Sequence, residues 1–185
     1  MEAIKWSEET LNNMLTEPSA ALVEDLKRLE GDIMVLGAGG KMGPDICVLA
    51  KKASVLGGSD RKIYAVSRFS DAAAAERLRS HGVTVIAADL MDANALQALP
   101  DCKNIIYMAG RKFGTNGTEY LTWGMNAWLP CMVVQRFRQS NIVVFSSGNL
   151  YPKVSTASGG ATERVRTVPV GEYCMSCLGR ERAFE

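Results

Sequence analysis

The sequence has little histidine, no long hydrophobic run and no excess of either charge. His81 is its single histidine, and together with one Cys-x-x-C pair, Cys174 and Cys177, it cannot complete an ordinary structural zinc site. Lys and Arg number 21 against 20 Asp and Glu, and these charges are scattered, which disfavours nucleic acid as a partner. No apolar stretch approaches the roughly 20 residues that a membrane-spanning helix needs.

The N-terminal residues, MEAIKWSEETLNN, lack the charged-then-apolar pattern of a secretory signal. We therefore expect a soluble, cytoplasmic protein with no membrane partner. The five cysteines are odd in number and lie mostly in apolar segments, which suits reduced thiols better than a disulfide framework. With 47% hydrophobic residues, the 185-residue chain can form one domain with a sizeable core, and we expect a helical extension over 1–30 ahead of a domain over 31–185.

Short apolar runs rich in β-branched residues alternate with segments of helical spacing. The runs predict strands buried on both faces, at 33–36, 63–66, 83–87, 105–108 and 142–145. Helices are expected between them, at 41–56, 71–80, 92–99 and 118–139, and Pro130 should kink or divide the last one. This order predicts an α/β fold with a doubly wound parallel sheet.

The residues ahead of the first strand predict a further helix. Pro18 is well placed to open it, Leu22, Leu26 and Leu29 share one of its faces, and Gly31 ends it. We expect this helix to cover an edge or the bottom of the sheet; an interaction arm for a partner is the alternative. Later in the chain, His81 precedes Gly82 at the expected end of a helix, where an imidazole meets the helix dipole.

The stretch VLGAGGKMGPDI, residues 35–46, places four glycines between the first strand and the first long helix. Bare backbone at such a turn lets a pyrophosphate approach closely, and the start of the helix offers unbonded N–H groups with a favourable dipole. Glycine also serves tight turns with no chemical role. The strand before the turn and the helix after it favour dinucleotide binding.

The spacing Gly37-x-x-Gly40-x-x-Gly43 resembles the fingerprint of the extended short-chain dehydrogenase/reductases, the NAD(P)-dependent epimerase/dehydratase family. Further matches follow in the family's order over 32–185. They are Asp89-Leu90 after the third strand, YMAG at 107–110, Asn126 in GMNAWLP, Ser147 in VVFSSGNLYP, and Tyr173 among Thr162, Glu163, Pro169 and Glu181.

The resemblance implies a Rossmann-like fold and a set of functional residues. The implied catalytic residues are Tyr173, as general acid or base, with Ser147 and Asn126. The implied cofactor-binding residues are Gly37, Gly40, Lys41, Met42, Gly43, Ser67, Arg68, Asp89, Leu90, Ala109 and Gly110.

The end of the second strand bears on which dinucleotide binds. An acidic residue there would accept hydrogen bonds from a ribose 2′-hydroxyl and repel a 2′-phosphate. The chain reads YAVSRFSD, with Ser67 at that position and Arg68 beside it. A hydroxyl and a guanidinium favour the phosphate, so we expect NADP(H) rather than NAD(H). The alternative is that Arg68 is a solvated surface arginine.

The family's lysine, one helical turn after the tyrosine, is Cys177 in this chain. A free tyrosine has a pKa of about 10, so full ionisation near pH 7 needs about 4 kcal/mol, which a neutral thiol cannot supply. Another cation could substitute, Tyr173 could act mainly as a proton donor in a reduction, or the chemistry could be lost. The candidate cations are Lys112, Arg111 and Arg180, and Lys112 ranks first because its loop borders the nicotinamide end in the family.

These residues lead to two functional hypotheses. The first is an NAD(P)-dependent oxidoreductase or epimerase/dehydratase-like protein that moves hydride to or from a hydroxyl or carbonyl carbon of a small molecule, a nucleotide sugar being one candidate. The second is a non-catalytic NADP(H)-binding module. Because family members continue past the tyrosine helix, we expect the chain to be truncated before a substrate domain; a naturally minimal protein is the alternative. The resemblance also implies a homodimer through the long helix and the Tyr173 helix.

Overall fold

The computed structural model describes residues 6–112 and 116–185. The chain forms two compact units. The first unit comprises Met1–Asp89, Pro100–Met108 and Gln139–Val143, and the second comprises Leu90–Leu99, Ala109–Arg138 and Val144–Glu185. The boundaries expected from the sequence, 1–30 and 31–185, stay a prediction.

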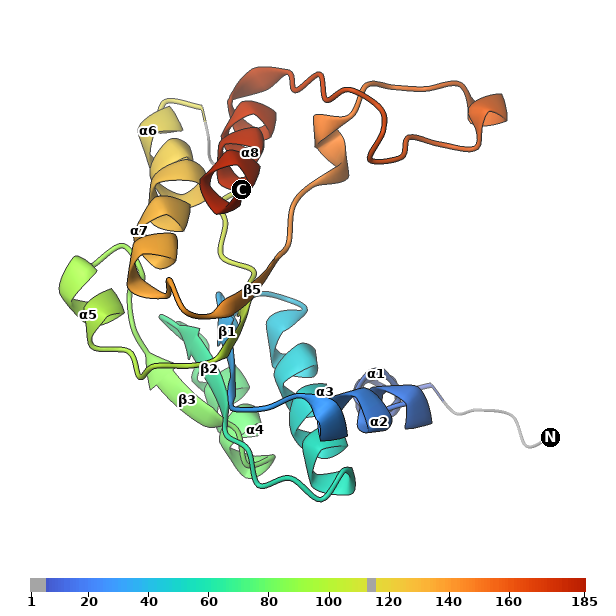
Figure 1. Ribbon diagram of the computed structural model, residues 1–185, viewed down its shortest axis with the longest axis vertical. Coiled ribbons are helices and arrows are strands. Elements are labelled where there is room, and N and C mark those ends of the chain that lie inside the picture. The colour runs from blue at the N-terminus through green and yellow to red at the C-terminus, as the bar shows by residue number, and fades with distance from the viewer. Residues whose placement is uncertain (1–5, 113–115) are drawn as a thin grey trace. The chain divides into compact units, whose positions relative to one another are not determined.

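Five strands form one sheet in the order β3-β2-β1-β4-β5. The strands are β1 (Ile33–Leu36), β2 (Ile63–Ser67), β3 (Thr84–Ala87), β4 (Asn104–Tyr107) and β5 (Asn141–Val144). β1 pairs in parallel with both β2 and β4, so that Val35 lies opposite Ala65 and Ile106, and β2 pairs in parallel with β3. The predicted α/β fold with a Rossmann-like parallel sheet is confirmed (Figure 1).

Burial separates the central strands from the outer ones. All four residues of β1 are buried, whereas every residue of β3 and β5 is exposed or partly buried, and Val143 is 62% exposed. The prediction that all five strands are buried on both faces is therefore wrong for β3 and β5. These are the edge strands, and an edge strand has a neighbour on one side only.

Two helices of the first unit pack beside the sheet. α3 (Gly43–Leu56) places Cys47, Val48 and Ala53 in the core, and burial raises the pKa of Cys47 to about 12. α4 (Ala72–Ser80) is capped at its N-terminus by Asp71, whose side chain accepts a hydrogen bond from the Ala73 N–H, and at its C-terminus by His81, which is followed by Gly82 with φ +75°. The predicted helix end at His81 is confirmed.

The first 30 residues contain two helices, α1 (Glu8–Leu15) and α2 (Ala20–Arg28). α2 is the expected helix, although it begins after Ser19 rather than at Pro18 because the Ser19 hydroxyl accepts a hydrogen bond from Leu22 N at 3.2 Å. Leu26 is buried and packs in the core, while Arg61 Nη2 donates to the Leu26 carbonyl at 2.9 Å. α2 lies beside α3, so it covers a helix of the first unit (Figure 1).

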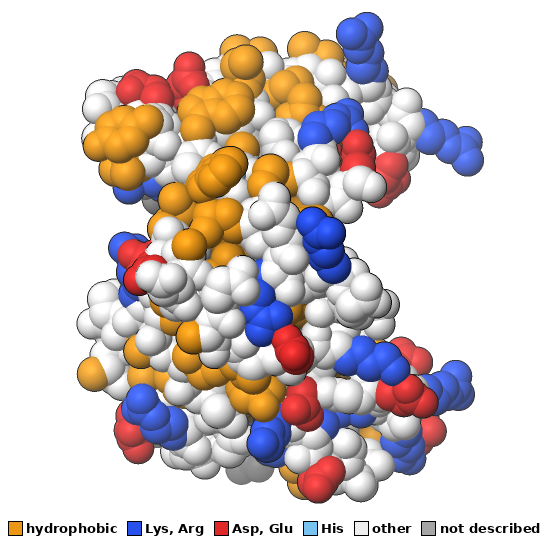
Figure 2. Space-filling model, turned by 60° about the vertical axis from the view of Figure 1, so that its left-hand side comes forward, with side chains coloured by type: hydrophobic (Ala, Val, Ile, Leu, Met, Phe, Trp, Pro, Cys, Tyr) orange, Lys and Arg blue, Asp and Glu red, His pale blue; other side chains and the backbone are white. Residues whose placement is uncertain are grey.

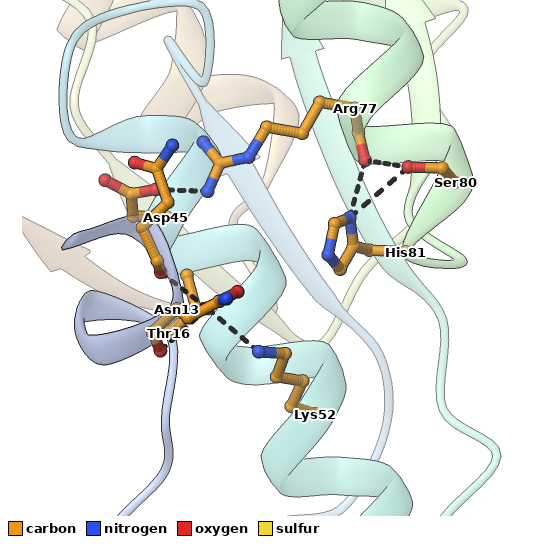
Figure 3. A network of polar contacts seen from close by, with 8 residues as sticks. Asn13, Thr16, Asp45, Lys52, Arg77, Ser80 and His81 are labelled. Carbon is orange, nitrogen blue, oxygen red and sulfur yellow. Dashed lines mark hydrogen bonds and ion pairs between the residues drawn. The ribbon is translucent and has the colours of Figure 1, made fainter. Parts of the chain in front are cut away.

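Polar contacts tie α1 and α4 to α3 (Figure 3). Lys52 Nζ, on α3, donates to Thr16 Oγ1 at the end of α1 over 3.0 Å. Arg77, on α4, forms an ion pair with Asp45 of α3 at 2.8 Å, and His81 Nδ1 lies 2.8 Å from the Arg77 carbonyl oxygen. Within the expected helical extension over 1–30, the sequence predicts in detail only the helix near Pro18; α1 is a further helix of that extension, and none of its residues is buried.

The second unit is mainly helical. Its helices are α5 (Ala93–Gln97), α6 (Glu119–Trp123), the π-helix η1 (Gly124–Trp128), α7 (Leu129–Arg136) and α8 (Gly171–Phe184), with short 3-10 turns η2 (Gly148–Leu150) and η3 (Thr156–Ser158). The single helix expected over 118–139 is divided at η1, directly before Pro130, as the proline predicts. Pro130 has no N–H, and in an α-helix its ring would clash with the carbonyl of Asn126. Every helix in the described part of the chain is too short or too polar to cross a membrane.

The turn from β1 into α3 packs tightly. Gly37 has φ +92°, and its N–H donates to the Val66 carbonyl at 2.9 Å. A Cβ built on Gly43 would lie 2.4 Å from the Ala38 carbonyl oxygen, whereas one built on Gly40 would meet only the Gly37 oxygen, at an ordinary 3.6 Å. The fold therefore requires glycine at 37 and 43 but not at 40.

We expect Gly43→Ala to lower the free energy of unfolding by about 3 kcal/mol or more, because rigid backbone occupies the space that a Cβ needs. Gly40→Ala is the matched control and should change it by no more than about 0.5 kcal/mol. Urea denaturation followed by circular dichroism measures both. Equal stability of the two variants would contradict this packing.

A second prediction concerns the anchoring of α2. Leu26→Ala should lower the free energy of unfolding by about 2–3 kcal/mol, because it leaves a cavity between α2 and the core. Leu15→Ala, at a position 51% exposed on α1, should cost no more than about 0.5 kcal/mol. The same denaturation measurement compares them, and a Leu26→Ala variant as stable as the control would show that α2 is not anchored by its buried face.

Candidate functional site

The glycine turn of the first unit leaves backbone bare at the start of a helix. α3 is 14 residues long, and its N-cap, Met42, makes no side-chain capping hydrogen bond. Gly39, Gly40, Lys41 and Met42 are all exposed. A helix of this length stabilises an anion at its N-terminus. Packing does not require the bare backbone at Gly40. That this turn holds the pyrophosphate of a dinucleotide stays a prediction.

The ends of β2 and β3 lie next to this turn. A Cβ built on Gly39 would lie 2.5 Å from Ser67 Oγ, which places the Ser67 hydroxyl against the turn. Ala88 N donates to the Ser67 carbonyl at 2.9 Å, and Asp89 follows as an exposed residue. The first unit thus brings together the glycine turn, Ser67 and the segment leading to Asp89 at the carboxyl ends of three adjacent strands.

The segment after Ser67 has an unusual backbone. Arg68 is exposed, and Phe69 has φ +47°, in the left-handed region that a bulky side chain rarely adopts. Phe69 is partly buried against the core of the first unit. Its packing offsets the backbone strain and holds the segment that carries Arg68.

In the second unit, Tyr173 lies in the first turn of α8, which begins at Gly171 with φ +80°. The Tyr173 side chain is hydrogen-bonded to the side chains of Ser147 and Cys177. Burial raises the pKa of Tyr173, and the bond to Ser147 and the charge of Arg180 oppose that rise. The structure therefore brings two of the expected catalytic side chains together, with the cysteine at the family's lysine position beside them.

Asn126 is buried in η1 and uses its amide fully. Its Nδ2 donates to the Arg111 carbonyl at 2.9 Å and to Ser176 Oγ at 3.0 Å. Its Oδ1 accepts from Arg111 N at 2.7 Å and from Arg180 Nη2 at 3.0 Å. Two donors and two acceptor positions are what an amide side chain offers. These contacts join η1 to α8 and to the segment after β4. The expected catalytic role of Asn126 stays a prediction.

The three candidate cations differ in their surroundings. Arg180 is buried on α8, and its Nη1 donates to the Phe145 carbonyl at 2.9 Å. Arg111 contacts Asn126 through its backbone, and its Nη2 donates to Thr118 Oγ1 at 3.3 Å. Lys112 is exposed, next to residues 113–115, which lie outside the description. Of these three, Arg180 is the one whose charge lowers the pKa of Tyr173. That Lys112 is the cation that replaces the family's lysine stays a prediction.

The remaining expected cofactor residues in the second unit are Leu90, Ala109 and Gly110. Leu90 and Ala109 are buried, and Gly110 is exposed. A Cβ built on Gly110 would lie 2.5 Å from Arg180 Nη2, so the missing side chain makes room for that guanidinium. Their contact with a coenzyme stays a prediction.

One face of the second unit is rich in exposed hydrophobic side chains (Figure 2). Tyr120 is 72% exposed and Trp128 is 62% exposed, and Leu121 adds to this surface. The homodimer implied by the resemblance would cover such residues. It stays a prediction.

Comparisons with known proteins show which family this arrangement belongs to. A family model described as the NAD dependent epimerase/dehydratase family matches residues 33–179. No curated protein matches the chain.

Solved structures show the same fold at low sequence identity. UDP-glucuronic acid 4-epimerase from Bacillus cereus, in complex with NAD, is 16% identical over 83% of this chain and 51% of its own, with a TM-score of 0.62. Pal from Bacillus thuringiensis is 14% identical over 82% and 50%, with a TM-score of 0.69. WbmG from Bordetella bronchiseptica, in complex with NAD and UDP, is 15% identical over 84% and 49%, with a TM-score of 0.63.

The chain spans about half the length of these solved structures. The family match covers both the glycine turn and Tyr173, and the sheet and helices follow the same fold. This chain belongs to the NAD-dependent epimerase/dehydratase family.

Proposed function

We propose that this chain binds a nicotinamide dinucleotide at the glycine turn and takes part in hydride transfer to or from a hydroxyl or carbonyl carbon of a small molecule. The observation that carries the proposal is the bare, exposed backbone at Gly40, which packing does not require, at the N-terminus of α3. Membership of the family and the NAD named with two of the solved structures support it.

The proposed coenzyme is NADP(H) in preference to NAD(H). Ser67 places a hydroxyl, not a carboxylate, at the end of β2, and Arg68 is exposed beside it. A guanidinium binds a 2′-phosphate through charge-assisted hydrogen bonds. A carboxylate would repel that phosphate.

The proposed chemistry assigns proton transfer to Tyr173. The bound coenzyme would supply or accept the hydride. Because burial raises the pKa of Tyr173, its hydroxyl stays protonated near neutral pH and can donate a proton to the substrate oxygen. Ser147, hydrogen-bonded to Tyr173, would orient that oxygen. This protonation state favours reduction of a carbonyl over oxidation of an alcohol.

A nucleotide sugar is the proposed class of substrate. The UDP-glucuronic acid 4-epimerase and the WbmG complex with UDP motivate this class. The residues that would recognise it are not assigned, since the chain spans about half of those proteins.

A second candidate function is a dinucleotide-binding module without catalysis. It is favoured by Cys177, which stands where the family has its lysine, and by the raised pKa of Tyr173. A tyrosine that stays protonated is a poor general base. Both candidates include coenzyme binding, and they differ in whether hydride is transferred.

Ser67→Asp tests the coenzyme preference. Isothermal titration calorimetry should show NADP(H) affinity falling about tenfold or more, about 1.4 kcal/mol, because the new carboxylate repels the 2′-phosphate. NAD(H) affinity should hold or improve. Ser80→Asp, at the C-terminal end of α4, adds the same charge as a control and should change neither affinity. If wild-type protein binds neither coenzyme, the proposed function is wrong.

The protonation of Tyr173 predicts how turnover depends on pH. Stopped-flow absorbance with a panel of carbonyl compounds and nucleotide sugars should show a reduction rate that is flat from about pH 6 to about pH 9 and falls above the pKa of Tyr173. Tyr173→Phe should lower this rate at least about 10²-fold while coenzyme affinity is kept. Undiminished turnover in Tyr173→Phe would exclude the acid role. Coenzyme binding without any turnover in the wild type would favour the non-catalytic module.

A further inference from the structure

A surface cavity lies beside the C-terminal half of α3, away from the glycine turn. Its volume is about 390 Å³, which is in the range of small-molecule sites, and it belongs wholly to the first unit. Lys51, in its wall, is eight residues after Gly43, about 12 Å along the helix axis, so the cavity is separate from the proposed coenzyme site. The lining residues come from the linker after α1, from α3 and from the end of α4: Glu17, Pro18, Lys51, Lys52, Val55, Leu56 and His81.

The α3 side of the cavity combines two cations with two apolar side chains. Lys51 and Val55 are four residues apart, as are Lys52 and Leu56, so each lysine lies one helical turn before an apolar residue. Val55 is 59% exposed and Leu56 is 63% exposed, although other residues of α3 are buried in the core. Pro18 adds a third apolar side chain to the wall. The cavity therefore offers positive charge next to uncovered apolar surface.

Both ammonium groups in this wall have neutral partners. Lys51 Nζ donates to the Arg61 carbonyl at 3.3 Å. Lys52 Nζ donates to Thr16 Oγ1 at 3.0 Å (Figure 3). In the described part of the chain, neither ammonium forms an ion pair or a further hydrogen bond. An ammonium has three donors, so two remain on each for a ligand. Two positive charges that share one cavity without an ion-paired carboxylate favour an anion there.

Neighbouring contacts hold the polar side chains of the cavity in place. Thr16, the acceptor for Lys52, is 2% exposed. The Lys51 stem runs beside Gly82, since a Cβ built there would lie 3.3 Å from Lys51 Cε. The His81 ring is fixed through Nδ1, which donates to a carbonyl oxygen of α4 at 2.8 Å, and it is turned toward α3 (Figure 3). Side chains held in this way lose less conformational freedom when a ligand binds.

We propose that this cavity binds a small apolar monocarboxylate. The two ammonium groups would hold the carboxylate by charge-assisted hydrogen bonds, and Val55 and Leu56 would cover the apolar body. Glu17 is the one carboxylate that the described lining residues include, and its charge favours a ligand with one negative charge over one with two. Glu17 and Pro18 precede the family match over 33–179, so the site joins the N-terminal extension to the family's fold. It does not rest on the proposed function.

Hexanoate is the probe for this site, and the test needs no coenzyme. In ¹H–¹⁵N NMR titrations of the whole chain, hexanoate should shift the backbone amides of residues 51–56 and of His81, with a Kd of about 1 mM or tighter. Hexanamide has the same body without the charge, hexylammonium reverses the charge, and acetate lacks the body. Each of these three should bind at least about tenfold more weakly.

Four variants locate the carboxylate. Lys52→Met and Lys51→Met each remove one ammonium and should weaken hexanoate binding about fivefold or more. Lys62→Met removes a lysine of the same unit that does not line the cavity, and should leave the affinity within about twofold. Glu17→Gln should hold or tighten binding, because it removes the like charge. Circular dichroism checks folding, and if Lys52→Met displaces α1, the contrast between Lys51→Met and Lys62→Met decides.

Equal binding of hexanoate and hexanamide, or equal affinity in Lys51→Met and Lys62→Met, would overturn the proposal. Amide shifts confined to residues away from the cavity would overturn it as well. Weaker binding in Glu17→Gln would contradict a plain monocarboxylate and indicate a ligand that also carries an ammonium group. Coenzyme affinity is measured separately by calorimetry, so protein that binds hexanoate as expected but no coenzyme would refute only the proposed function.

Discussion

The contact between the start of α3 and the turn after β1 is the constraint on which the first unit depends. Gly43 sits against the Ala38 backbone with no room for a Cβ, so the first residue of α3 packs directly on the turn that follows the strand. Ser67, at the end of the neighbouring strand, lies against Gly39 in the turn that leads into α3. Packing and ligand binding both call for small residues at 37 and 43. At Gly40 packing does not require a small residue, because the nearest atom to an added Cβ would lie at an ordinary 3.6 Å. Only the proposed ligand binding calls for glycine there.

The second unit depends on a different local irregularity. Pro130 cannot donate a hydrogen bond, and the chain widens into the π-helix η1 just before it. The buried Asn126 lies in this π-helix, where its amide bonds the Arg111 backbone, Ser176 and Arg180. One side chain thus connects η1 to the Arg111 segment and to α8, through residues that lie 15 to 54 positions from Asn126 in sequence. In each unit, candidate functional residues lie close to a glycine, which has no side chain, or to a proline, which has no backbone N–H.

The glycine turn and Pro130 are both visible in the sequence, which is one reason why much of the fold could be predicted from it. Buried strands and the glycine turn follow from local composition, and β1 has the bounds that its apolar run predicts. The exposure of β3 and β5 depends on strand order, which a short apolar run does not encode. Leu11, Met14 and Leu15 give α1 an apolar stripe at helical spacing, but all three are exposed, so the pattern does not predict what α1 packs against. The Tyr173 and Asn126 partners depend on tertiary contacts, so the sequence could suggest Arg180 as a cation without showing that Asn126 and Phe145 hold it.

The packing around Arg180 links the missing lysine to the direction of the proposed reaction. A guanidinium at this position needs space, which the absent side chain of Gly110 provides, and neutral acceptors, which Asn126 and Phe145 provide. A short, neutral Cys177 beside Tyr173 raises the pKa of the phenol, and Arg180 lowers it less than burial raises it. The balance leaves Tyr173 protonated near neutral pH. Because Arg180 lies seven residues from Tyr173, about two helical turns along α8, its charge opposes the effect of burial only in part, and Tyr173 keeps the proton that the proposed reduction needs.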